Sequence, residues 1–213
     1  MKFWLVLVFL IGCAPMKQAD SDPQTTTTGS DALVARLAAV NVAELATGLA
    51  SDPQGQALWS EYNDVGLYAA LVEDESHTTA VRFAAALMLK SHGEMADPAA
   101  TAQVFAAALQ QDLVGYAYPW GWLWAEDDPL GLLGGTFIDI GRPAVPALTA
   151  LLDDPTPRDS YLGSEEATEM AMRGYRVKDF AGFYLARIIG VELPYEHDLD
   201  KRDHALAALR AKL

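Results

Sequence analysis

From residue 31 to its end, this chain consists of segments whose apolar residues are spaced as on one face of a helix, and residues that commonly cap helices separate these segments. Asp97-Pro98 is the clearest signal, because a cap residue followed by proline at the first helical position is typical of a helix start. Alanine is abundant and long stretches lack β-branched runs, which favours helix over sheet. We therefore predict an all-α domain over residues 32–213, without a core strand. The expected helices cover residues 31–50, 55–74, 78–92, 99–112, 144–153, 176–189 and 200–212.

Two parts of the chain resemble each other. "AALVED" at 69–74 corresponds to "TALLDD" at 149–154, and "AVRFAAALMLKSHG" at 80–93 corresponds to "RVKDFAGFYLARIIG" at 176–190. Small residues recur where two helices must approach closely, and leucine recurs on the same face. A single helix pair cannot bury its apolar face alone, so repeated pairs stack on one another. The aligned positions are Val81 with Val177, Arg82 with Lys178, Ala85 with Ala181, Ala86 with Gly182, and Leu89 with Leu185.

This repeat resembles those of the HEAT family. "GRPAVPALTALLDDP" at 141–155 is similar to the first helix and turn of such a repeat, and "VKDFAGFYLARIIG" at 177–190 is similar to its second helix. The segment 158–174 is an insertion between them. The resemblance implies a helical solenoid with a concave or ridged binding surface, and it implies no catalytic residues. The alternative is a non-repetitive, alanine-rich helical bundle.

The first residues have the order of a secretory signal peptide. Lys2 supplies a positive charge, residues 3–11 are continuously apolar, and small residues follow at Gly12 and Cys13. The apolar run is well short of the roughly 20 residues that a membrane-spanning helix needs. We therefore expect residues 1–12 to be removed as a signal peptide.

Leu10-Ile11-Gly12-Cys13 resembles the lipobox of bacterial lipoproteins. The resemblance implies diacylglycerol on Cys13, cleavage before it, and acylation of the new amino terminus, so several acyl chains would anchor the protein in a membrane of the bacterial envelope. Residue 14 is Ala rather than the Asp that favours inner-membrane retention, which points to the outer membrane. The alternative is an ordinary signal peptide with an incidental cysteine. Residues 13–31 are polar and are expected to be a disordered tether.

The net charge limits the possible partners, and the cysteine count limits what can stabilise the fold. The chain has 15 basic and 29 acidic residues, and loss of Lys2 with the signal peptide changes its net charge from −14 to −15. Such an acidic surface argues against nucleic acid and against electrostatic docking on anionic lipids, so the lipid would carry membrane binding. Cys13 is the only cysteine, so no disulfide is expected and a hydrophobic core must supply the stability.

The segment "YAYPWGWLW" at 116–124 is the main candidate binding feature. In an extended backbone its alternating aromatic side chains would share one side and form a platform for a glycan, a peptide or an apolar ligand. The alternative is a core plug between helix pairs, which is favoured because large aromatic side chains are usually buried, and Pro119 and Gly121 would interrupt a regular strand. The alternating residues are Tyr116, Tyr118, Trp120, Trp122 and Trp124.

No motif in the chain names a reaction. It lacks the common nucleophile, zinc, phosphate-loop and dinucleotide patterns, so no cofactor or metal is expected. A helix is expected to start at Ser164, and Glu165, Glu166 and Glu169 are expected to cap it. We therefore expect a non-catalytic, lipid-anchored binding or scaffold protein with a protein or glycan partner. The alternative is an envelope glycan hydrolase that uses the aromatic segment with Glu126, Asp127 or Asp128.

Overall fold

The structure is a computed structural model, and it describes residues 24–48, 51–126, 129–158, 168 and 171–213. The described residues form ten α-helices and no β-strand; their one β-bridge is the isolated pair Pro157 and Arg176. The expectation of an all-α protein is therefore confirmed. Cys13 and the rest of the predicted lipobox, together with Glu165, Glu166 and Glu169, lie outside the described residues.

Most connections between consecutive helices are short, but residues 112–130 separate α6 from α7, and a long stretch also precedes α10. The described residues also form two 3₁₀ turns, η2 (Tyr118–Trp120) and η3 (Arg142–Ala144). The α-helices are α1 (Gln24–Ala38), α2 (Val42–Gly48), α3 (Pro53–Glu61), α4 (Val65–Glu73), α5 (Thr79–Ser91), α6 (Pro98–Gln111), α7 (Gly131–Ile140), α8 (Val145–Ala150), α10 (Val177–Ile189) and α11 (Leu199–Arg210).

Side-chain caps fix where several helices begin. The Asp97 carboxylate accepts a hydrogen bond from the backbone N–H of Ala100 at 2.9 Å, and Pro98 occupies the first helical turn as predicted. Such a cap satisfies a backbone donor that the first turn leaves unpaired. The same device begins four other helices, at Asp52, Asp64, Thr78 and Asp198.

Three helix boundaries differ from the sequence expectation. The helix expected over 55–74 is two helices, because the Asp64 side chain caps a new helix through the N–H groups of Gly66 and Leu67. The stretch 31–50 is likewise divided between α1 and α2, where Asn41 accepts from the N–H of Ala43. Helix α1 begins at Gln24, inside the segment 13–31 assigned to the tether. Helix α7 was not expected.

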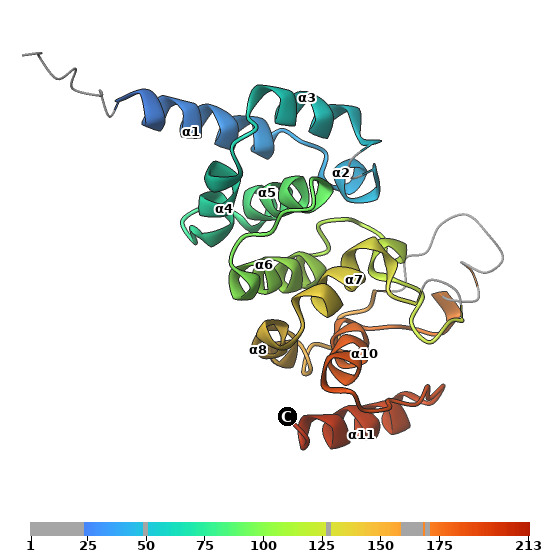
Figure 1. Ribbon diagram of the computed structural model, residues 1–213. Helices are drawn as coiled ribbons and strands as arrows, with labels where there is room; N and C mark the ends of the chain where they lie inside the picture. The colour runs from blue at the N-terminus through green and yellow to red at the C-terminus, as the bar shows by residue number, and fades with distance from the viewer. Residues whose placement is uncertain (1–23, 49–50, 127–128, 159–167, 169–170) are drawn as a thin grey trace, which may run out of the picture.

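The helices pack mainly against near neighbours in the chain (Figure 1). Helix α4 lies along α5, α5 packs on α6, and α6 packs on α7 and α8. Helix α10 then packs on α7 and α8 and carries α11 on its other side, while α1 and α2 cover α5. Figure 1 shows the result as an elongated arrangement that runs from α1 and α3 at one end to α11 at the other.

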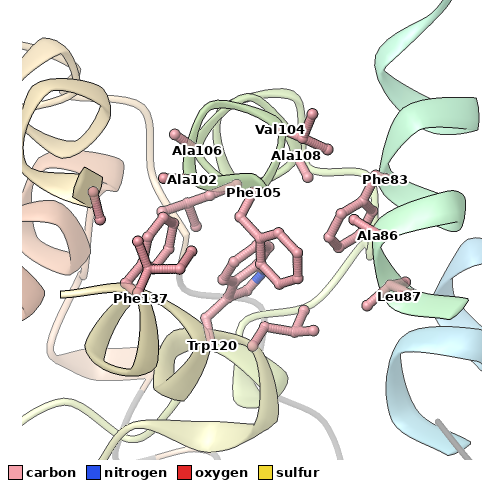
Figure 2. Close-up of a cluster of buried hydrophobic side chains, with 14 of the residues drawn as sticks. Phe83, Ala86, Leu87, Ala102, Val104, Phe105, Ala106, Ala108, Trp120 and Phe137 are labelled. Atoms are coloured by element: carbon pink, nitrogen blue, oxygen red, sulfur yellow. The ribbon is translucent and has the colours of Figure 1, made fainter. Parts of the chain in front are cut away.

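Aromatic side chains occupy the middle of this arrangement. Figure 2 shows Phe83, Phe105, Trp120 and Phe137 pointing toward one another from α5, α6, η2 and α7. The Phe83 and Phe105 rings meet edge to face at 5.0 Å, and the Trp120 ring lies 6.2 Å from Phe83 and 6.4 Å from Phe137. Burying large rings contributes strongly to the stability of a core that has no disulfide among its described residues.

Small residues allow the closest helix contacts. Ala85 on α5 and Ala181 on α10, aligned in the repeat, are both fully buried. At Gly182 an added methyl group would collide with the Leu206 side chain of α11. Glycine at this position therefore lets the end of the Leu206 side chain pack directly against the backbone of α10.

Candidate functional site

The aromatic segment 116–124 does not run as an extended strand. Its middle forms the 3₁₀ turn η2, and Gly121 follows with φ 108°, a conformation that favours glycine. Pro129 and Leu130 backbone atoms also lie too close to Gly121 for a side chain to fit there. Because of this turn, the alternating side chains leave the backbone in different directions rather than on one side.

Trp120 belongs to the core. Its side chain is 1% exposed and packs in the aromatic cluster of Figure 2. The Tyr184 hydroxyl donates a hydrogen bond to the backbone carbonyl of Trp120, which ties the turn to α10. Trp120 is therefore part of the core and is not available to bind a ligand at the surface.

Trp124 packs in a second aromatic cluster, made of different neighbours from those of Trp120. Its ring lies 5.1 Å from Phe183, 5.7 Å from Tyr175 and 5.6 Å from Tyr195. Its indole N–H donates to the carbonyl oxygen of Leu193 at 2.8 Å. These contacts hold it in a left-handed backbone conformation, φ 59°, which is unfavourable for a bulky side chain.

Tyr116 and Tyr118 form a stacked pair at the surface, with ring centroids 5.2 Å apart. Tyr118 is 38% exposed, and partial burial raises the pKa of its hydroxyl above the ordinary value. Trp122 is half-buried. The segment thus divides among a core side chain, a second cluster and a surface pair, and the single five-ring platform is absent.

The carboxylates of the hydrolase alternative are only partly described. Glu126 is exposed, whereas Asp127 and Asp128 lie outside the described residues. No described pair of carboxylates at this loop therefore has the separation that glycoside hydrolysis requires.

Buried charges join α10 to α11. Asp179 is fully buried and lies 3.0 Å from the Arg176 guanidinium and 3.1 Å from that of Arg202, which is 1% exposed. Arg202 also donates to the carbonyl oxygens of Arg173 and Glu196. Because each charge has several partners, this cluster stabilises the fold and offers no unpaired group to a ligand.

A pocket lies between α5, α6 and α7. Its cavity volume is about 160 Å³, and apolar side chains of Ala86, Leu89 and Phe105 form part of its wall. Lys90 and Asp139 also line it, with Nζ and Oδ2 3.8 Å apart, and Glu94 lines it from the loop after α5. The pocket therefore combines an apolar wall with charged side chains.

Two buried hydroxyl groups belong to the same pocket. Thr101 is 4% exposed and Thr136 is 1% exposed, and neither Oγ1 has a hydrogen-bond partner among the described residues. Thr149, by contrast, donates to the carbonyl of Val145 one helical turn earlier, at 2.7 Å. The Tyr68 hydroxyl is the third buried side-chain oxygen without a hydrogen-bond partner among the described residues, but Tyr68 does not line this pocket. Burial raises the pKa of Tyr68 to about 12. A buried polar group without a partner calls for a bound water or ligand.

Sequence reasoning missed this pocket. Thr101 is the signal that could have found it, because it is a hydroxyl on the buried, alanine-rich face of α6. Thr136 and Asp139 lie on α7, which was not expected as a helix, so their proximity to α5 could not be deduced.

The described residues hold no metal site and no membrane-spanning helix. Within the described residues, no group of three or more His, Cys, Asp and Glu side chains could hold a metal ion. No helix in the described part of the chain is both long and apolar enough to cross a membrane. Comparison of the chain with protein-family models, curated proteins and solved structures gave no match.

Proposed function

We propose that this chain is a lipid-anchored binding or scaffold protein of the bacterial envelope, with a HEAT-like helical-repeat domain. Its anchor is acyl lipid on Cys13, its location is the outer membrane, and its partner is a protein or a glycan. The chemistry is recognition rather than catalysis. The lipobox Leu10-Ile11-Gly12-Cys13 supports the anchor, and the helix pairs support the repeat.

The observation that carries the repeat is a matched turn in the two aligned segments. Asp74 Oδ1 accepts from the N–H of Ser76 at 2.9 Å, and Asp154 Oδ1 accepts from the N–H of Thr156 at 2.9 Å. These aspartates end "AALVED" and "TALLDD", which are aligned in the sequence. Each aspartate follows the first helix of a pair, α4 or α8, and α4 packs on α5 as α8 packs on α10.

Packing between consecutive helices from α4 to α7 gives the repeat further support. Helical-repeat proteins bury a continuous core by stacking each pair on its neighbours, and they recognise partners along the extended surface that results. The exposed Tyr118 and its stacked neighbour Tyr116 are the part of the aromatic segment that a partner could reach.

Intact-mass measurement of the protein extracted from its native membranes tests the anchor. We expect a mature chain that begins at Cys13 and carries acyl mass, and Cys13→Ala should abolish both the acylation and the membrane association. Ala14→Asp should move the protein from outer-membrane to inner-membrane fractions. A mature wild-type chain without acyl mass would overturn the anchor.

Substitution of the surface pair tests the recognition role. Tyr116→Ala and Tyr118→Ala should leave the melting temperature close to that of the wild type and weaken capture of whatever co-purifies with detergent-extracted protein. Equal capture by wild type and by both variants would show that the pair is not the contact.

A further inference from the structure

The pocket between α5, α6 and α7 has features that the proposed scaffold role does not require. Its volume of about 160 Å³ is close to that of engineered cavities that hold a benzene-sized molecule, and below the ~300 Å³ typical of drug-sized ligand sites. The pocket therefore suits a molecule of about six to ten non-hydrogen atoms. Leu89, Phe105 and Ala86 would contact an apolar body of that size.

The two threonines define the polar group that such a molecule must carry. A rotation of about 120° around χ1 places the hydroxyl of a threonine where its methyl group lay, so Thr101 and Thr136 can each turn a hydroxyl toward the pocket that they line. A hydroxyl both donates and accepts, whereas a carboxylate only accepts and an ammonium only donates. Because a threonine hydroxyl itself donates and accepts, all three groups could pair with both threonines, but the hydroxyl is the only uncharged one, and burial of Thr101 and Thr136 disfavours a charged group beside them.

The charged side chains define a second ligand group. Lys90 is paired with Asp139, and Glu94 is exposed with no ion pair among the described residues. The lining then carries one net negative charge, on a chain whose net charge is −14. A cation is attracted to this site and an anion is repelled, since the only cationic side chain of the lining is already compensated.

We propose that this pocket binds a small hydroxylated amine, with the hydroxyl at Thr101 and Thr136, the apolar body against Phe105, and the ammonium at Glu94. The site is independent of the lipid anchor and of the surface tyrosines. It differs from the tyrosine pair in requiring a small molecule rather than a macromolecular partner.

Three matched probes test this ligand class on the full-length protein in detergent. They are trans-4-aminocyclohexanol, cyclohexylamine without the hydroxyl, and cyclohexanol without the ammonium, with binding measured by isothermal titration calorimetry. We expect the aminoalcohol to bind at least about tenfold more tightly than either probe that lacks one group. If none of the three binds, the pocket holds ordered water only and the proposal is overturned. Equal affinity for all three would mark an unselective apolar cavity, which also overturns it.

Two variants assign the groups. Thr136→Val removes a buried hydroxyl while keeping the side-chain shape, and it should weaken binding of the aminoalcohol without changing that of cyclohexylamine. Glu94→Gln is a surface change that leaves the core intact, and it should weaken the two amines but not cyclohexanol. A uniform loss for all probes in either variant would show that the residue acts only through the shape of the pocket. That result contradicts the assignment, and circular dichroism of each variant shows whether the fold is retained.

Discussion

The Tyr184 hydroxyl of α10 donates to the backbone carbonyl of Trp120, and the two residues close around Gly134 of α7. This contact joins η2, α7 and α10 at one point. An added methyl group on Gly134 would lie 2.6 Å from the Trp120 carbonyl oxygen and would also collide with the Tyr184 phenol. The next residue, Gly135, has no atom within 4 Å of the same position.

Neighbouring glycines therefore give opposite outcomes on substitution. Gly134→Ala should destabilise the protein by about 1–3 kcal/mol, because backbone and phenol must move apart. Gly135→Ala should be neutral or stabilise it by roughly 0.5–1 kcal/mol, since alanine is favoured over glycine inside a helix. Urea denaturation of both variants measures this difference, and a lower midpoint for Gly135→Ala than for Gly134→Ala would refute the close contact.

Substitutions of Trp120 and Tyr118 compare a buried with an exposed side chain of the aromatic segment. Trp120→Ala should cost about 3–5 kcal/mol, because it removes the central ring of the core cluster. Tyr118→Ala is the matched control, and it should leave the melting temperature nearly unchanged because Tyr118 is 38% exposed. Thermal unfolding followed by circular dichroism compares them. Equal melting temperatures for the two variants would contradict the burial of Trp120.

Ala181 tests the tight packing of α10. Ala181→Leu should cost roughly 1–3 kcal/mol, since the residue is fully buried and a larger side chain must displace its neighbours. Ala208→Leu, on the exposed face of α11, is the control and should change stability little. An unchanged denaturant midpoint for Ala181→Leu would mean that the packing around residue 181 can accommodate a larger side chain, which contradicts the prediction.

Asp179 tests the buried charge cluster. Asp179→Ala should destabilise the protein by about 3–5 kcal/mol, because it leaves the Arg176 and Arg202 guanidinium groups buried without their shared anion. Asp153→Ala breaks the exposed pair with Arg210 and serves as the control, with a midpoint close to that of the wild type. Comparable losses for the two variants would argue that burial of the Asp179 cluster adds nothing.

The lowered pKa of the Asp203 carboxyl group predicts how the free energy of unfolding changes with pH. Partial burial alone would raise the pKa of this carboxyl, but hydrogen bonds from Lys178 and Arg176 outweigh it and lower the pKa below its ordinary value. The folded state therefore holds the charged form more strongly than the unfolded state does. The stability that this carboxylate contributes is complete above the unfolded pKa and is lost as the pH falls through the lower, folded value.

Urea midpoints measured from neutral pH to about pH 2 test this dependence. Asp203→Asn should be less stable than the wild type at neutral pH, and the two proteins should converge at the acidic end. A constant difference between them at every pH would show that the charge of Asp203 does not contribute.

The helices that could be predicted from the sequence are those with local signals. Asp97-Pro98 and Thr78 begin helices through contacts within three residues, so the sequence alone carries them. Helix α7 has no such cap, and the glycines of "GLLGGTFIDI" lower its intrinsic helix propensity. Its helical state depends on packing against Tyr184 and Trp120, which lie outside the segment.

The candidate sites show the same limit. The alternation in "YAYPWGWLW" would place its rings together only in an extended backbone, and η2 with Gly121 bends that backbone instead. The pocket needs α5, α6 and α7 in contact, so Thr101 and Thr136 become neighbours of one cavity only through tertiary packing. Long-range proximity of this kind is not encoded in any local pattern.

The elongated arrangement has a consequence for how the molecule opens. Helices α5 and α6 have neighbours on both sides, whereas α11 rests mainly on α10 at the end of the arrangement. Local opening of α11 therefore exposes less surface than opening of α6, and its amide hydrogens should exchange with solvent sooner. Exchange rates should accordingly rise from the centre of the chain toward its carboxyl end, so that the protein loosens progressively rather than all at once.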